Sequence, residues 1–145
     1  MADSLGLCFQ DSKVEGPTTC LEFLGIELDS HAMEACLPSR KLEFLSSLLP
    51  QWKSKTHCTL LELQELTGYL QFCSQVIPYS RAFLCSFFNF TSTFKSDFSH
   101  CRIPRSTRRD LEWWIMYSSS WKGIHFVALT HPVIHIYTDA SCNGV

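Results

Sequence analysis

The sequence TCLEFLGIELDSHAMEACLP, residues 19–38, contains the pattern that decides the predicted fold. A first apolar run, from Leu21 to Leu28, is followed by the polar residues Asp29-Ser30-His31 and then by a second apolar run. Two short apolar runs around a polar turn are typical of a β-hairpin. Gly25 lies inside the first run, where a glycine marks either a bulge or the close approach of another backbone. We therefore expect a hairpin over these residues, with one of those two features at Gly25.

Length and composition favour a folded chain with one hydrophobic core. Of the 145 residues, 46% are hydrophobic and 13% are aromatic, which argues against global disorder. The formal net charge is −2, so any attraction to nucleic acid has to come from local basic patches. The 8 cysteines are scattered, with no Cys-x-x-Cys pair. Since neither a signal peptide nor a membrane-spanning run is evident, we expect an intracellular protein, in the cytoplasm or nucleus, with reduced thiols.

Apolar residues at three- and four-residue intervals predict two helices after the hairpin. The first begins at Pro38-Ser39, where Ser39 can act as the cap, and Pro50 ends or kinks it. The second, residues 59–77, is the clearest helix, because Thr59 and Glu62 have the spacing of a capping box. The predicted core positions of these two helices are Leu42, Leu45, Leu49, Leu63, Leu66, Leu70, Cys73 and Ile77.

Two features of the middle of the chain need a structural explanation. Gly68 lies within the second helix and costs about 1 kcal/mol relative to alanine, and we expect a close helix crossing to account for it. Residues 79–98 are rich in phenylalanine at helical spacing, which predicts a further helix. These phenylalanines could form a core or a platform on which bases stack, and we favour the core.

A charged connector precedes a last helix, predicted over residues 107–118. The connector contains Arg102, Arg105, Arg108 and Arg109. Such a cluster can bind phosphates; alternatively it is a solvated helix entry whose charge Asp110 and Glu112 offset, and we favour the second interpretation. Neighbouring residues on a helix diverge by about 100°, so either Trp113 or Trp114 is expected to stay partly exposed or to meet another subdomain.

The C-terminal segment predicts a strand that opens a second hairpin. Residues 133–138 are β-branched and aromatic, which is typical of a strand, and Asn143-Gly144 is a strong hairpin signal. Asp139 follows the strand directly. We expect the chain to be a fragment that ends before the return strand of this hairpin.

The N-terminal segments resemble the reverse transcriptases of retroelements. Phe23-Leu24-Gly25-Ile26 is similar to the primer-grip hairpin of that family, and Leu5-Gly6-Leu7 and Lys13 precede it at an agreeing spacing. The longer sequence TCLEFLGIELDSHAMEACLPSRKLE, residues 19–43, is especially similar to DIRS-like retrotransposons, the tyrosine-recombinase type.

The C-terminal segments resemble the same family. The DLEWW element, residues 110–114, followed by Trp121-Lys122-Gly123, is similar to the linker region of these proteins. Tyr137-Thr138-Asp139-Ala140-Ser141 resembles the first catalytic strand of ribonuclease H. The resemblance therefore covers nearly the whole chain, from the end of a palm subdomain to the opening of a ribonuclease H domain.

The resemblance implies an α+β fold in four parts. These are the end of the palm with the primer-grip hairpin (1–38), a helical thumb-like region (39–100), a connection helix and linker (101–131), and the truncated start of a ribonuclease H-like domain (132–145). It also implies an RNA/DNA primer–template duplex as the partner, contacted by Phe23, Leu24 and Gly25 and by the helix over residues 59–77. Lys13 matches a lysine near the leaving pyrophosphate, and Asp139 matches a ligand of Mg²⁺.

The chemistry of this family requires more acids than the chain provides. Two-metal catalysis uses several converging carboxylates, whereas Asp139 is the one family-matching candidate and no adjacent Asp-Asp pair occurs. Lys13 as a solvated lysine and Asp139 as a turn residue are the plainer interpretations. We therefore predict neither polymerase nor nuclease activity for this chain by itself. The rival hypothesis is a non-catalytic helical protein-interaction module, and a hydrolase built around Asp139 ranks last.

Overall fold

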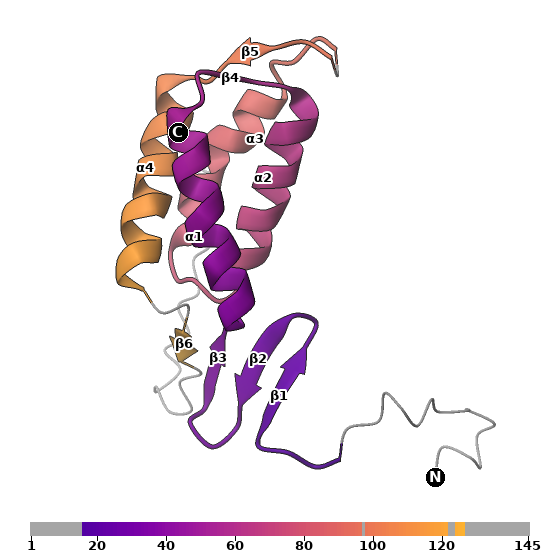
Figure 1. The fold of residues 1–145 in the computed structure, drawn as a ribbon, viewed down its shortest axis with the longest axis vertical. Helices are drawn as coiled ribbons and strands as arrows, with labels where there is room; N and C mark the ends of the chain where they lie inside the picture. Colours follow the sequence, from indigo (N-terminus) through magenta and orange to yellow (C-terminus); the bar gives the residue numbers. More distant parts are fainter. Residues whose placement is uncertain (1–15, 97, 122–123, 127–145) are drawn as a thin grey trace, which may run out of the picture.

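The helices form a bundle, and a small antiparallel sheet lies at one end of it (Figure 1). The computed structural model describes residues 16–96, 98–121 and 124–126. Its helices are α1 (Ser39–Ser54), α2 (Leu60–Cys73), the 3-10 helix η3 (Ser80–Leu84), α3 (Cys85–Thr91) and α4 (Arg105–Ser120). Its strands are β1 (Cys20–Phe23), β2 (Ile26–Asp29), β3 (Glu34–Cys36), β4 (His57–Cys58), β5 (Cys101–Arg102) and β6 (Ile124–Phe126). The α+β class predicted from the sequence is confirmed.

The segment predicted as one hairpin forms three strands. β1, β2 and β3 pair in order, and β6 adds to the far side of β3. The polar turn lies where it was expected, and the Asp29 carboxylate accepts bonds of 2.8 Å from the backbone N–H groups of His31 and Ala32. The predicted bulge is wrong, because a two-residue turn at Leu24-Gly25 divides the first apolar run. Both turn residues have positive φ, 50° and 78°, as type I′ hairpin turns require.

Helix α1 starts where the sequence predicted and passes through its proline. The residue at its N-cap is Pro38, which makes no side-chain capping bond, so the expected Ser39 cap is wrong. Pro50 does not end the helix, which continues to Ser54. Pro50 has no N–H to donate to the carbonyl of Ser46, and both residues are exposed, so that carbonyl can bond to water.

Helix α2 confirms the strongest local prediction. Thr59 accepts a bond from the Glu62 N–H, and the Glu62 carboxylate accepts one from the Thr59 N–H, which completes the capping box. The helix ends at Cys73, and residues 74–77 continue in turns. All the predicted core positions of residues 59–77 are at most 3% exposed; they are Leu63, Leu66, Leu70, Cys73 and Ile77.

The phenylalanine-rich segment is helical in two short pieces, so the single long helix predicted there is wrong. Tyr79 has a left-handed backbone, with φ of 62°, and η3 and α3 follow it. The preference for a core role is nevertheless confirmed. Phe87 and Phe90 are buried, and Phe83 and Phe94 pack against the same core.

Helix α4 packs along α1 and closes the bundle. Trp114 is buried and its Nε1 donates to the Phe83 carbonyl at 3.2 Å. Trp113 is half-buried and stacks on Phe83, with ring centroids 3.9 Å apart. The prediction that the two tryptophans differ in burial is therefore confirmed. None of the helices in the described ranges is long and apolar enough to cross a membrane.

Candidate nucleic-acid interface

The turn between β1 and β2 carries two exposed apolar side chains. Phe23 is 57% exposed and Leu24 is 79% exposed. The turn projects them because consecutive positive φ values reverse the chain within two residues, so the strands can pair up to Phe23 and Ile26. The residues that the resemblance assigns to the duplex, Phe23, Leu24 and Gly25, thus lie together at one hairpin tip.

The hairpin tip rests on the helices through Lys41 and Phe72. The Lys41 Nζ lies 3.7 Å from the centre of the Phe72 ring, which is a cation–π contact between α1 and α2. A Cβ placed on Gly25 would lie 2.5 Å from that Nζ and 3.3 Å from Phe72 Cζ. Arg40, at the start of α1, also pairs with Glu22 on β1. Gly25 is therefore required by its backbone angle, and a side chain added there would also displace the Lys41 ammonium group from its place beside Phe72.

A groove of about 700 Å³ runs between α1 and α2. The α2 side contributes Gln64, Gly68 and Phe72 at intervals of four residues, which places them along one line of the helix. The α1 side contributes Phe44, whose ring meets Tyr69 edge-on at 4.9 Å. A Cβ on Gly68 would meet nothing within 4 Å. The close helix crossing expected at Gly68 is therefore wrong, and the glycine opens into the groove instead.

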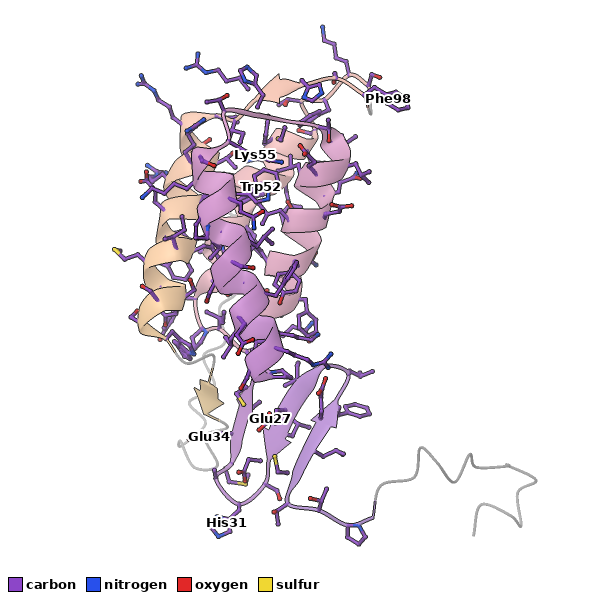
Figure 2. All side chains as sticks on the ribbon, viewed as in Figure 1. Glu27, His31, Glu34, Trp52, Lys55 and Phe98 are labelled. Carbon is purple, nitrogen blue, oxygen red and sulfur yellow. The ribbon has the colours of Figure 1, made fainter. Side chains whose placement is uncertain are left out.

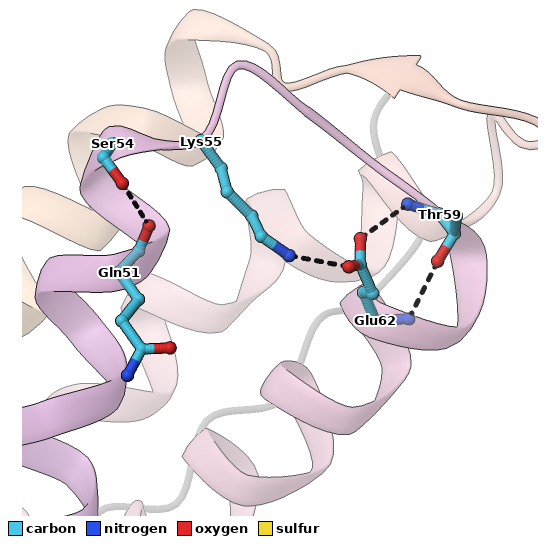
Figure 3. Close-up of polar contacts among 5 residues, drawn as sticks. All are labelled: Gln51, Ser54, Lys55, Thr59 and Glu62. Carbon is cyan, nitrogen blue, oxygen red and sulfur yellow. Dashed lines mark hydrogen bonds and ion pairs between the residues drawn. The ribbon is translucent and has the colours of Figure 1, made fainter.

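A lysine bounds the groove at the other end. The Lys55 Nζ donates to Glu62 Oε1 at 2.7 Å, and Glu62 is also the second partner in the capping box (Figure 3). The hydrogen bond from Lys55, followed by that from the Thr59 N–H, lowers the pKa of Glu62. The ionised carboxylate thus holds both the start of α2 and the Lys55 ammonium group.

The two faces of the sheet differ in chemistry. Residues that pair across antiparallel strands share a face, and the pairing register places the acidic side chains of three strands together. That face contains Cys20, Glu22, Glu27, Asp29, Glu34 and Cys36. The opposite face contains Leu21, Phe23, Ile26, Leu28 and Ala35. A phosphate backbone would be repelled from the first face, so the hairpin can contact a duplex only with its tip and its apolar face.

Two of the predicted site residues lie outside the described residues. These are Lys13 and Asp139, so the predicted pyrophosphate contact and the Mg²⁺ ligand are not placed. Among residues 16–96, 98–121 and 124–126, no group of three histidine, cysteine or acidic side chains could hold a metal ion. The described part of the candidate site consists of cations, aromatic rings and an open helix face.

The resemblance pointed to Phe23, Leu24 and Gly25, and the local sequence predicted helix α2, but the residues that connect them were missed. Lys41 and Phe72 are separated by most of two helices, and neither was assigned a role, although Lys41 lies within the segment 19–43. Gly68 was the residue that could have indicated the groove, but a close helix crossing was predicted there instead of open space. Comparison of this chain with protein-family models, with curated proteins and with solved structures gives no match.

Proposed function

We propose that this chain is the duplex-holding part of a reverse transcriptase–ribonuclease H protein. It binds an RNA/DNA primer–template and neither extends nor cleaves it by itself. The observation that carries the proposal is the open face of α2, where Gly68 lies between Gln64 and Phe72 and faces the groove. The thumb-like assignment of residues 39–100 and the primer-grip assignment of the hairpin belong to the same proposal.

The chemistry of the α2 face suits a duplex. An A-form duplex that contains RNA has a wide, shallow minor groove lined by 2′-hydroxyl groups and base edges. The missing side chain at Gly68 lets sugars approach the helix, the Gln64 amide can donate and accept hydrogen bonds, and the Phe72 ring offers an apolar surface. Lys55, which lines the groove, and Lys41, which contacts the lining residue Phe72, can neutralise phosphates.

A binding assay with two point variants tests the proposal. The fluorescence anisotropy of a labelled RNA–DNA hybrid is measured with the wild type, with Gly68→Gln and with Gln71→Leu. Gln71 is exposed on another side of α2 and does not line the groove, so Gln71→Leu is the matched control. We expect Gly68→Gln to weaken binding at least about tenfold and the control to leave it unchanged. Equal affinities for all three proteins would contradict the proposal.

A protein-interaction module remains the second candidate, because two large apolar side chains on α1 and α2 are exposed. Phe44 is 52% exposed and Leu61 is 62% exposed. Salt separates the two functions. A phosphate binder loses about 10³ or more in affinity between about 50 and about 200 mM salt when it makes several phosphate contacts. A protein-interaction module would bind the hybrid weakly at every salt concentration.

A further inference from the structure

Two segments that are distant in the sequence meet at the end of the bundle opposite the sheet (Figure 1). The first is the last turn of α1 with β4, and the second is β5 with the first turn of α4. The Arg108 guanidinium donates to the Lys55 carbonyl at 2.9 Å. The Ile103 N–H donates to the Thr56 carbonyl at 3.0 Å, and His57 pairs with Arg102 across the ribbon.

Half of the lysines and arginines of the chain lie at this end of the bundle. The cationic end, as we name it, consists of Lys53, Lys55, Arg102, Arg105, Arg108 and Arg109. These are 6 of the 12 lysine and arginine residues in the sequence. Lys53, Arg102, Arg105 and Arg109 are exposed, whereas Lys55 and Arg108 are half-buried. The arginines that looked like a local cluster in the sequence are therefore joined by lysines from another helix.

Asp110 and Glu112, the acids expected to offset this positive charge, differ in their exposure to solvent. Asp110 is only 8% exposed, and it lies within the bundle. Glu62 is already paired with Lys55, and Glu112 is exposed. By contrast, residues 16–39 contain four acids and no lysine or arginine. Figure 2 shows this polarity, with Glu27 and Glu34 on the sheet and Lys55 near the opposite end.

We infer that the cationic end binds the phosphodiester backbone of nucleic acid and extends the contact beyond the α1–α2 groove. Lys55 carries this continuity, because it lines the groove and its carbonyl holds Arg108. Guanidinium groups bind phosphate oxygens in a bidentate manner, and four of the six cations are arginines. The inference rests on the proposed function for its choice of nucleic acid among polyanions. It also replaces the solvated helix entry that the sequence favoured for the arginine cluster.

The test removes two exposed arginines, Arg105 and Arg109, whose side chains form no hydrogen bond or ion pair among the described residues. Binding of the labelled RNA–DNA hybrid is measured against salt concentration for the wild type and for the double variant Arg105→Gln/Arg109→Gln. The control, Arg81→Gln, removes one charge from an exposed residue outside the cationic end. The slope of log K against log salt is negative, and each lost phosphate contact reduces its magnitude by about 0.9. We therefore expect a slope whose magnitude is smaller by about 1.8, and affinity lower by about tenfold, in the test variant.

The outcomes separate this inference from the proposed function. If the test and control variants have the same slope, the cationic end does not bind phosphates and the inference is wrong. In that case a loss of binding in Gly68→Gln would still support binding of the hybrid in the α1–α2 groove. If Arg105→Gln/Arg109→Gln weakens binding and Gly68→Gln does not, the inference about the cationic end stands and the proposed binding in the groove is wrong. Binding to vesicles that contain phosphatidylserine, without binding to the hybrid, would overturn both.

Discussion

At the scale of single residues, the two glycines of the candidate interface have opposite surroundings. Gly25 has a φ of 78°, and its hydrogen atoms face Lys41 and Phe72. Gly68 lies in a regular helix and faces open space. The first glycine is required by the fold, whereas the second lowers the stability of its helix although no close packing requires a glycine there. A residue that costs stability and fills no packing role is a common mark of a functional surface.

Replacing each glycine by alanine is expected to change stability in opposite directions. Gly68→Ala should raise the free energy of unfolding by about 1 kcal/mol, because alanine favours the helix and meets no neighbour. Gly25→Ala should lower it by about 1 kcal/mol or more, because a side chain at positive φ is strained and its Cβ collides with Lys41. Urea denaturation followed by circular dichroism measures both. A stabilising Gly25→Ala would show that the hairpin tip is not held as described.

The buried thiols should be chemically silent. Burial raises the pKa of Cys58 to about 11 and that of Cys73 to about 12. Since the thiolate is the reactive form, both should react slowly with a thiol reagent at pH 8, whereas the exposed Cys85 should react quickly. Mass spectrometry after timed alkylation gives the rate at each position. Equal rates at Cys58 and Cys85 would contradict the burial of Cys58.

The same pKa shifts give a sign for the effect of alkaline pH. The folded protein holds the protons of Cys58 and Cys73 more tightly than the unfolded chain does, where the thiol pKa is near 9.0. Their contribution to stability is therefore fully present below pH 9 and is lost as the pH rises through the folded pKa values. The burial of Tyr69, which raises its pKa to about 12, acts in the same direction.

At the scale of elements, the sequence predicted what local chemistry controls. Helix α2 was found because its cap, Thr59 with Glu62, and its leucine stripe lie within one short segment. The break at Tyr79 was missed, because packing of the bundle decides it. Whether Pro50 ends or kinks α1 was left open, and the helix continues through it to Ser54. The turn at Leu24-Gly25 was missed because a glycine within an apolar run suits a bulge and a turn equally. The groove was not predictable, since its two sides come from different helices.

The capping box of α2 provides an element-scale prediction. Thr59→Ala removes the oxygen that accepts from the Glu62 N–H and should lower the free energy of unfolding by about 1 kcal/mol. Thr59→Ser keeps that oxygen and serves as the control. Thermal unfolding of the three proteins measures the difference. If Thr59→Ala and Thr59→Ser melt together, the cap contributes nothing and the stability of α2 comes from its packed face alone.

Acid should weaken the same end of α2 through Glu62. Its pKa is lowered in the folded protein, so its contribution is present above about pH 4.5, the ordinary value, and is lost as the pH falls through the lowered pKa. The partial exposure of the Lys55–Glu62 pair to solvent keeps this contribution small. The difference in stability between the wild type and Glu62→Gln should therefore be larger at pH 7 than at pH 3. A constant difference would show that the charge of Glu62 is not involved.

At the scale of the whole molecule, the described residues leave an apolar surface of the sheet uncovered. Phe23 and Leu28 are 57% and 41% exposed on the same face, and β1 is an edge strand among the described strands. Exposed apolar edges favour association between copies of a chain. Leu28→Thr should therefore lower the light scattering of concentrated protein. The control, Glu34→Gln, changes the opposite face and should not lower it. Unchanged light scattering in Leu28→Thr would show that copies of the chain do not associate through this face of the sheet.

The pairing of β3 with β6 has a consequence for how the chain acquires its shape. These two strands flank the entire bundle in the sequence, yet they lie side by side in the sheet. Closing so long a loop is entropically unfavourable until the intervening helices have shortened it. In a cell, a ribosome must therefore release nearly all of the described chain before β6 can pair with β3 and complete the sheet. Pulsed hydrogen exchange should show the amides of β3 protected after those of α2.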